Sequence, residues 1–549
     1  MLFPLMFGIA ALVFIIGYFT YGRFMSNVYG LDNSIETPAK RFEDGIDFVP
    51  AHPAILLGHH FASIAGAGPV TGPIAASMVF GWLPTIIWVV VGSTFLGGPH
   101  DMGSIVASIR HDGSSIGIVT EKWIGKAGKY LFLSFTLLTL ILVVAVFLVM
   151  SSGTFAGDPV VAFVSTLFII LALISGVLIY KCHVPLLAVT IVMLAAIVGA
   201  CVYVDETTCP ILIGKIFTHN QDFWNGFLAV YCFFASVLPV WMLLQPRDYL
   251  ASYFLYFAVA IGAYGMFTGS ALDTGTIPRL AANVQYFGFT SKAMWPAMFV
   301  MVACGAISGF HGLIGSGTTS RQIRCEKDSV LIGYGAMLIE GLVAVISIGT
   351  LMVLGVEGAK GLSPVQIFSQ GFGKFSTLVG LDATFGTRMG AIAINSFLLT
   401  SLDTAVRLGR YQFQEITNGK ISMYPATIII MVLAVVLVYT KTHDAAGNVI
   451  PTWSAIWPIF GAANQMVAAL SLLAISAWIK LGLKKDHSFM YIPFWFMLVT
   501  TIYSLVIQIN ERLSVAQPNY LLSALSALLI ILGIAMSIAG AKAMHGNKA

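Results

Sequence analysis

Seven ionisable side chains lie inside strongly apolar stretches of the sequence, where each one needs a function or a partner. They are His59, His60, His100, Asp101, His311, Glu340 and Asp403. An ionised side chain at the centre of a bilayer costs at least about 2.5–3.5 kcal/mol on insertion scales, so such residues are retained in ion or substrate pathways or in buried pairs. Histidine exchanges a proton near neutral pH, and a buried carboxylate can bind a proton or a cation. The set therefore predicts a site for H⁺ or Na⁺ within the membrane.

Four of these residues are the candidates for ion or proton coupling: His100, Asp101, Glu340 and Asp403. Asp101 follows a Gly-Gly-Pro-His sequence that favours a break in its helix, and Glu340 lies in the middle of an apolar run. Each also has a structural interpretation, because a carboxylate can cap a kink or pair inside the bundle. For Asp403 the favoured interpretation is an ion pair with Arg407, four residues later on the same helical face, near the cytoplasmic end of the helix.

The stretch Gly58–Pro73 joins a helical pattern to residues that end a helix. A helical pattern covers 53–65, and the residues that follow it include Gly66, Gly68, Pro69, Gly72 and Pro73. In a helix interior Gly costs about 1 kcal/mol and Pro about 3 kcal/mol. We therefore predict a helix that stops after Ala65, runs extended and restarts at Pro73. At membrane depth such a break is tolerated only where protein buries it or where it lines a wet cavity, and discontinuous helices form the substrate and ion sites of secondary transporters.

A second stretch repeats this pattern. Gly309–Gly317 matches Gly58–Gly66 in the spacing of Gly, His and Gly, and the two begin 251 residues apart. The second copy continues into Thr318-Thr319-Ser320, whose hydroxyls can serve freed backbone groups. The match predicts a second break at 315–320.

The residues around the two predicted breaks are the candidate substrate site. They are His60, Ser63, Gly66, Gly68, Thr71, His311, Ser316, Thr318 and Asn464. His60 and His311 can pair with a substrate carboxylate or carry a proton; alternatively, they hydrogen-bond the backbone carbonyls that the breaks leave free. A helix restarting at Pro73 would point free N–H groups into the break, which favours a substrate with a carboxylate. No catalytic residue and no metal site is predicted.

Composition identifies the elements that must position these residues. Of 549 residues 58% are hydrophobic and 9% charged, which indicates an all-α polytopic membrane protein. Continuous apolar runs argue against a β-barrel, the net charge of +4 gives no reason to expect nucleic acid, and the six scattered Cys indicate neither disulfides nor zinc. The segment 2–20 is expected to be a retained span. About fifteen spans are predicted, at 3–22, 52–81, 83–109, 128–150, 158–180, 184–204, 222–243, 248–271, 293–318, 330–355, 385–403, 424–440, 453–478, 489–508 and 519–541.

Basic residues set the orientation. With the N-terminus outside and the C-terminus cytoplasmic, 20 of the 28 Lys and Arg fall on the cytoplasmic side, as the positive-inside rule requires. The two broken spans are then the second and the ninth, so they cross in opposite directions, as in an inverted-topology repeat. We predict one transporter domain, made of an N-terminal span and loop (1–51), a first repeat (52–204), linker helices (205–292), an inverted second repeat (293–478) and C-terminal helices (479–549). The end of the first loop, Gly45–Pro50, either packs beneath the first broken helix or is part of a solvated connector.

The motifs that are absent from the sequence also narrow the function. Each Gly-Lys pair is followed by a residue other than Ser or Thr, so the sequence has no P-loop, and energy would come from an ion gradient. A proton-coupled secondary transporter fits best, and no enzyme activity is expected. The alternatives are a sodium-coupled symporter, a passive channel, a nutrient sensor, and a haem-containing redox membrane protein with ligands among His59, His60, His100, His183 and His311.

At these residues the sequence resembles the carbon starvation protein A (CstA) family of inner-membrane transporters. The matching stretches are Gly58–Pro69, His100-Asp101, Phe310–Leu313 with Ser316–Thr319, Leu402–Ala405 with Arg407–Tyr411, and Trp457-Pro458 with Gly461–Gln465. The resemblance implies a bacterial or archaeal plasma membrane protein that takes up a small-molecule substrate under carbon starvation, either pyruvate by proton symport or a di- or tripeptide. It also implies the LeuT/APC-like 5+5 inverted repeat with two discontinuous helices, a lipid bilayer as surroundings, and no cofactor beyond the coupling ion, H⁺ or Na⁺. It leaves the oligomeric state open.

Overall fold

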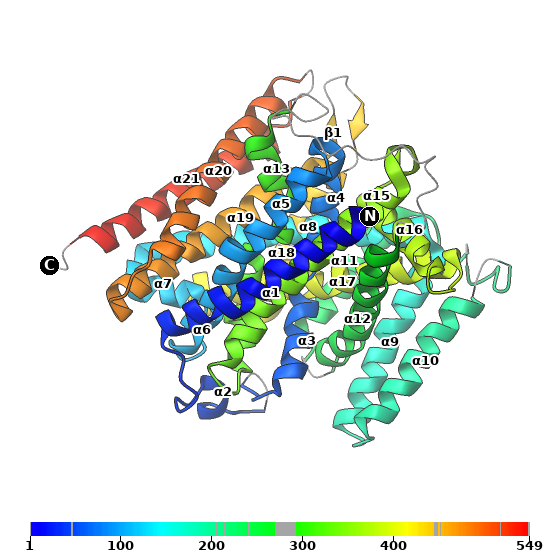
Figure 1. Ribbon diagram of the computed structural model, residues 1–549, viewed down its shortest axis with the longest axis horizontal. Coiled ribbons are helices and arrows are strands. Elements are labelled where there is room, and N and C mark those ends of the chain that lie inside the picture. Colours follow the sequence, from blue (N-terminus) through cyan, green and yellow to red (C-terminus); the bar gives the residue numbers. More distant parts are fainter. Residues whose placement is uncertain are drawn as a thin grey trace.

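The computed structural model describes residues 2–45, 48–204, 207–213, 215–239, 242–269, 292–443, 448–450, 452–515 and 518–546. Within these residues the protein is helical, with one short hairpin formed by the antiparallel strands β1 (Thr442–His443) and β2 (Val449–Ile450) (Figure 1). The expectation of an all-α membrane protein is therefore confirmed.

The helices that precede the segment 270–291, which the structure does not describe, are α1 (Leu2–Tyr29), α2 (Pro38–Arg41), α3 (Pro53–Ile64), α4 (Gly68–Phe80), α5 (Trp82–Gly92), α6 (Gly98–Ile109), α7 (Ile116–Ile124), α8 (Lys126–Gly157), α9 (Pro159–Tyr180), α10 (Leu186–Tyr203), α11 (Gln221–Val237) and α12 (Leu244–Thr268). Those after it are α13 (Met294–Val302), α14 (Gly309–Gly317), α15 (Ala336–Ala359), α16 (Pro364–Thr377), α17 (Ala383–Ile416), α18 (Met423–Val438), α19 (Thr452–Trp478), α20 (Ser488–Leu513) and α21 (Tyr520–His545). Short π-helical turns, Ser93–Gly97 and Val330–Gly335, lead into α6 and α15.

Twelve helical segments of the described residues are long and apolar enough to cross a membrane, or thirteen if the bent pair α3–α4 is one span. The sequence predicts about fifteen. The two remaining predicted spans coincide with α11 and α18, which are only 17 and 16 residues long. The count of fifteen therefore stays a prediction that depends on whether these two shorter helices cross the bilayer.

The first break is where the sequence places it, but it is shorter than predicted. α3 ends at Ile64, α4 begins at Gly68, and the two are bent by 46°. The predicted restart at Pro73 is wrong, because Pro73 lies inside α4. Pro69 occupies the first turn instead, where the missing N–H would have had no helical partner.

The second break lies before the matched motif, not at 315–320 as predicted. α13 ends at Val302 and, after a short 3₁₀ turn, α14 begins at Gly309 and runs through the glycines to Gly317. Gly309 and Gly312 serve close packing within the helix, which ends at Gly317: a Cβ at Gly309 would collide with α19, and one at Gly312 with His100. The matched motifs consequently precede the break in one span and follow it in the other.

The broken spans meet at two levels. α4 crosses α13 at Gly68 and Gly72, where an added Cβ would collide with Cys304 and with the carbonyl oxygen of Val302. α3 packs against α14 on the other side of the breaks, so the two matched motifs face each other. The close backbone approach explains why small residues are needed in α4.

The loop after α1 returns to the second broken span. Val49 N donates to Arg321 O at 3.2 Å and Ala51 N donates to Gln322 O at 3.0 Å. The described end of this loop therefore packs against the end of the second broken span, while residues 46–47 lie outside the described residues. Packing beneath the first broken helix stays a prediction. α2 contacts the same 3₁₀ turn, Thr319–Arg321.

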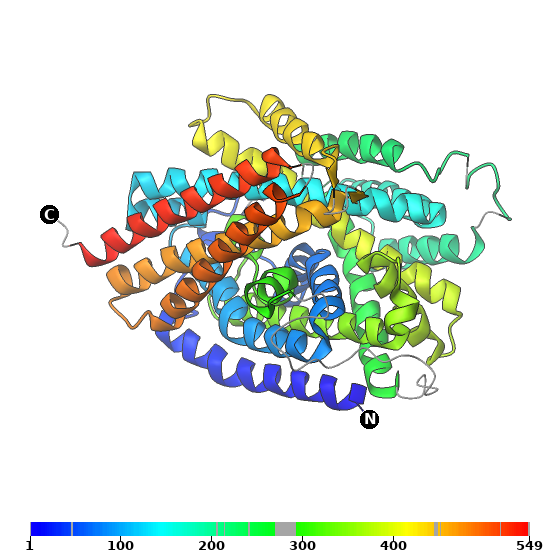
Figure 2. The ribbon, with the colours of Figure 1, turned by 90° about the horizontal axis from the view of Figure 1, so that it is seen from above.

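The two longest helices, α8 and α17, pack together in the centre, and α19 packs on α8 and α14. Figure 2 shows α1 along one edge of the molecule, and Figure 1 shows α9 and α10 side by side at one end, apart from the centre. α1 exposes large apolar side chains, including Leu5, Leu12 and Phe19. Such faces suit lipid, which agrees with a multi-pass membrane protein.

Candidate substrate and ion site

A chain of histidines and carboxylates joins three elements beside the breaks. His100 Nδ1 lies 2.7 Å from Asp101 Oδ1, and His311 Nδ1 lies 2.9 Å from Asp101 Oδ2. His311 Nε2 lies 3.3 Å from Glu340 Oε2. All four side chains are fully buried. His311 of α14 thus bridges a carboxylate of α6 and a carboxylate of α15.

Local backbone features bring these side chains together. The π turn Ser93–Gly97 and Pro99 place His100 and Asp101 in the first turn of α6. The second π turn, Val330–Gly335, packs against α6 and leads into α15, which carries Glu340. Single π turns inside α-helices recur at functional sites, because they shift the direction in which the following side chains point.

Several polar atoms of this cluster have no hydrogen-bond partner among the described residues. They are His60 Nε2, His100 Nε2 and Glu340 Oε1, and the contact of 3.3 Å between His311 Nε2 and Glu340 Oε2 lacks the geometry of a hydrogen bond. Leaving a buried polar group unpaired costs about 1–3 kcal/mol. Such groups are worth explaining individually, and a proton, an ion or a solute that binds here would give them partners.

His60 connects the first broken span to the second. Its Nδ1 lies 2.8 Å from Thr319 Oγ1, and both side chains are fully buried. The backbone of Ile64, the last residue of α3, interacts with the His311 ring. The structure therefore brings together His60, His311, Asp101, His100 and Glu340, all singled out from the sequence.

The small candidate residues lie at the breaks but form mostly local hydrogen bonds. Ser63 Oγ donates to His59 O, Ser316 Oγ to Gly312 O and Thr318 Oγ1 to Ile314 O, each within one helical turn. Gly66 lies in the first break with Ser401 Oγ and Phe147 beside it. Thr71 is buried on α4, and its Oγ1 has no hydrogen-bond partner among the described residues.

Asn464 uses its side-chain amide to hold the second break. Its Oδ1 accepts from Phe310 N at 2.9 Å, and its Nδ2 donates to Ser308 Oγ at 3.0 Å and to Cys304 Sγ at 3.4 Å. These bonds satisfy an N–H group at the start of α14 that has no partner within the helix. Asn464 therefore positions the break, and direct contact with a substrate stays a prediction.

Asp403 does not pair with Arg407. Its carboxylate accepts one hydrogen bond from Arg247 Nη1 and another from Tyr231 at 2.7 Å. Arg247 also lies 3.0 Å from Asp248, which lies 3.6 Å from His59 Nδ1. The same-helix pair was the wrong expectation, because Asp403 faces α11 and α12 across the bundle.

Arg407 serves the end of another helix instead. Its Nη2 donates to Ala235 O at 2.8 Å and to Leu238 O at 2.7 Å, while Arg410 Nη1 donates to Ser236 O at 2.8 Å. The last carbonyls of a helix have no partner within it, and buried carbonyls need one. The two arginines of α17 therefore cap α11, which ends inside the protein.

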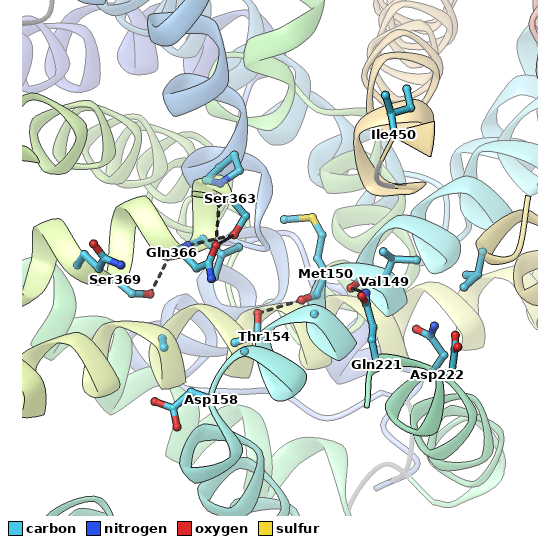
Figure 3. A pocket seen from close by; sticks show the side chains of 18 of the residues that line it. Val149, Met150, Thr154, Asp158, Gln221, Asp222, Ser363, Gln366, Ser369 and Ile450 are labelled. Atoms are coloured by element: carbon cyan, nitrogen blue, oxygen red, sulfur yellow. Dashed lines mark hydrogen bonds between the residues drawn. The ribbon is translucent and has the colours of Figure 1, made fainter. Parts of the chain in front are cut away.

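Two cavities lie at opposite ends of α17. A cavity of about 850 Å³ is lined by α8, α11, α16 and the start of α17 at Thr387 and Ala391 (Figure 3). A cavity of about 70 Å³ is lined by Ser63, Thr318 and the far part of α17 at Thr404 and Arg407. Ser401, which lies beside Gly66 of the first break, is between them along α17. His59 and Asp248 line the smaller cavity.

Sequence reasoning missed Arg247, Tyr231 and Thr319 and every polar residue of the larger cavity. Arg247 was assigned to a short loop, although a charged Arg-Asp pair directly after an apolar run is itself a signal of a buried partner. His183, a candidate for a haem ligand, lies in the turn between α9 and α10. Among the described residues, no group of three or more His, Cys, Asp or Glu is arranged to hold a metal ion.

The chain is similar in sequence to known transporters and in fold to a solved structure. The sequence profile described as "Carbon starvation protein CstA" matches residues 4–362 and 356–504. The "Peptide transporter CstA" of Campylobacter jejuni is 30% identical, with 90% of this chain and 78% of that protein covered. The "Pyruvate/proton symporter BtsT" of Escherichia coli K12 is 28% identical, with 84% and 75% covered. The solved structure of MhsT in complex with L-phenylalanine, a LeuT-fold protein, covers 90% of this chain and 99% of its own at TM-score 0.50 and 14% identity, a likeness of fold alone.

Proposed function

The chain belongs to the carbon starvation protein CstA family, and on that premise we propose that this secondary transporter is a proton symporter for a small carbon source, pyruvate or a short peptide. We place it in a bacterial or archaeal plasma membrane, with the N-terminus outside and the C-terminus in the cytoplasm. The excess of Lys and Arg on one side supports this orientation.

One observation carries the proton coupling: His311 bridges Asp101 and Glu340 in a fully buried setting beside the second break. A proton bound by this cluster changes which of its groups donate and which accept, and so changes what holds α14 against α6 and α15. Because His60 meets Thr319 just beyond α14, the first broken span is linked to the same event. Proton binding would thereby bias the position of the helices that bear the site.

The two cavities support alternating access. They lie at opposite ends of α17 with the first break between them, as expected when a solute reaches a central site from either side. The salt bridges joining His59 of α3, Asp248 and Arg247 of α12, and Asp403 of α17 would close the side of the smaller cavity.

We propose a revised division into inverted repeats. In the packing, α11 and α18 each contact both α8 and α17, α12 contacts α3 and α17, and α19 contacts α14 and α8. These matching contacts support repeats made of α3–α4, α5–α6, α8, α11 and α12 and of α13–α14, α15, α17, α18 and α19. α9 and α10 would then be a hairpin inserted into the first repeat, in place of the predicted linker pair at 205–292.

Purified protein in liposomes tests the function. We expect labelled pyruvate or dialanine to accumulate inside the liposomes under an inward acid gradient and not without a gradient. Competition between the two solutes identifies the substrate. Accumulation driven only by a Na⁺ gradient would replace H⁺ by Na⁺ as the coupling ion. Equilibration without accumulation would indicate a passive channel, and no flux under either gradient would contradict the proposal.

A further inference from the structure

The polar residues that line the cavity of about 850 Å³ are mainly neutral hydrogen-bonding ones, several of them amides, and we call it the amide pocket. Its polar lining includes Gln221, Asn225, Ser369, Gln366 and Gln370. Figure 3 shows Gln221 and Asp222 on one wall, Gln366 and Ser369 on the other, and Met150 and Thr154 between them. Such a lining, with apolar residues between the polar ones, is the usual make-up of a small-molecule site.

Asn225 gives the pocket a buried polar atom without a hydrogen-bond partner among the described residues. Its side chain is 7% exposed, it lines the pocket from α11, and its Oδ1 has no hydrogen-bond partner among the described residues. A buried amide oxygen left unpaired costs about 1–3 kcal/mol. A ligand that offers an N–H group at this position would remove that cost.

The charges at the rim have opposite signs. Asp222, in the first turn of α11, and Lys441 are both exposed and both line the pocket. Asp158, by contrast, is occupied, because it accepts from Val160 N at 2.9 Å as the N-cap of α9 and lies 3.8 Å from Arg388. Exposed charges of both signs around neutral amides suit a ligand with a cationic end, an anionic end and amide groups between.

We propose that the amide pocket is a second binding site, separate from the buried site at the breaks, and that it takes a zwitterionic peptide of two or three residues. Its volume lies within the range of about 300–1,000 Å³ that is typical for small-molecule sites, and a three-carbon acid would leave most of it to water. The inference rests on the proposed function in one respect, that the peptide is a solute waiting to be transported.

The pocket adjoins the proposed path without being part of the central site. Val149 and Met150 line it on α8, two and three residues after Phe147, which stands beside Gly66 in the first break. On α17, Ala391 lines it ten residues before Ser401, a distance of about 15 Å along a helix. A peptide held in the pocket would therefore lie next to the first break without occupying it.

Equilibrium binding of labelled trialanine to the full chain in detergent tests the site. We expect two peptides bound per wild-type chain and one per Asn225→Leu chain. In the variant, the dissociation constant of the amide pocket should be at least tenfold larger than in the wild type. Asn510→Leu is the matched control, because Asn510 is an exposed asparagine on α20, outside the pocket, and it should bind like the wild type. Unchanged binding by Asn225→Leu would overturn the proposal.

A second measurement covers the case in which Asn225→Leu does not fold. Gln370 is an exposed pocket residue, so Gln370→Cys should react with a maleimide, and trialanine should slow that reaction at least fivefold relative to a buffer control. A Cys182→Ser background removes the exposed native thiol. Absence of protection would overturn the proposal.

Failure of the inference and failure of the proposed function are distinguishable. If the wild type binds no trialanine, the amide pocket is not a peptide site, yet pyruvate uptake by the same preparation would leave the transport function standing. If trialanine binds with the expected dependence on Asn225 but no solute accumulates in liposomes, the pocket is supported and the transport proposal is contradicted.

Discussion

Asp403 of α17 is paired with Arg247 of α12, 156 residues earlier in the chain, and both side chains are fully buried. Tyr231 donates to the same carboxylate, so the charge is shared within a hydrogen-bonded group that joins three helices. The net contribution of a buried ion pair to stability is often small, but removing one partner leaves the other charge buried and strongly destabilises the protein.

Removing one partner of that pair should destabilise the protein. Asp403→Asn leaves the buried Arg247 guanidinium with Asp248 as its remaining carboxylate partner, and removing one partner from a buried ion pair costs up to about 3–5 kcal/mol. We expect a clearly lower midpoint of thermal unfolding in detergent. The double variant Arg247→Met/Asp403→Leu removes both charges of the pair and leaves Asp248 with His59 at 3.6 Å, so it should recover part of the loss. A double variant as unstable as the single one would contradict the pairing.

Asp101→Asn should abolish proton-driven uptake while leaving the protein folded. Asparagine keeps the size of the side chain, and its Oδ1 can still accept from one histidine while its Nδ2 donates to Nδ1 of the other, but it cannot bind or release a proton at this position. We expect at least a tenfold loss of accumulation under an inward acid gradient, measured in liposomes at equal protein content. Asp486→Asn, in an exposed loop, is the control. Wild-type accumulation by Asp101→Asn would move the coupling site elsewhere.

A larger side chain at the crossing of the broken spans should be costly. Gly72 approaches the carbonyl oxygen of Val302 so closely that even a Cβ has no room, so Gly72→Leu must displace backbone. Overpacking of this kind typically costs about 1–3 kcal/mol. Gly199→Leu is a matched helical control with nothing within 4 Å of its Cβ position. Equal melting midpoints for the two variants would show that the crossing is looser than described.

His111 should make stability depend on pH in the acid range. It lies just beyond α6, its Nδ1 is 2.6 Å from Ala107 O, and its Nε2 accepts from Trp123 Nε1 at 2.8 Å. Burial is the main cause that lowers the pKa of His111 below the ordinary value of 6.5. The unfolded chain therefore takes up the proton first, so this contribution to stability is complete above about pH 6.5 and is lost as the pH falls toward the lowered pKa.

Comparing unfolding midpoints at pH 7.5 and pH 5 checks this expectation. The fall in midpoint should be larger in the wild type than in His111→Gln, which keeps a neutral side chain at both pH values. Identical falls in the two proteins would assign the pH dependence to other groups.

Local sequence signals predicted the parts of the site that depend on chemistry. Ionisable residues in apolar runs are costly enough that few occur without a partner, and this is why Asp101, His311 and Glu340 could be named as candidates before their contacts were known. The break after Ile64 followed from the cost of Gly and Pro in a helix. These signals act within a few residues and are readable from one chain.

Contacts between distant helices determined the features of the site that local sequence patterns did not predict. Gly309–Gly317 has the composition of a break, but packing against α19 and α6 holds it as a helix, so the real break moved to the residues before it. Asp403 and Arg407 have the spacing of a same-helix pair, yet each meets a partner from another helix. Position in the bundle, which no local pattern encodes, overrode spacing in both cases.

The capping of α11 by Arg407 and Arg410 has a mechanical consequence. Since three carbonyls at the end of α11 are held by side chains of α17, the two helices have to travel as one rigid body during any rearrangement. The broken spans, by contrast, touch that frame through small residues and hydroxyls. Movement during a transport cycle would then be confined to the broken spans and their neighbours, while α11 and α17 would stay fixed relative to each other.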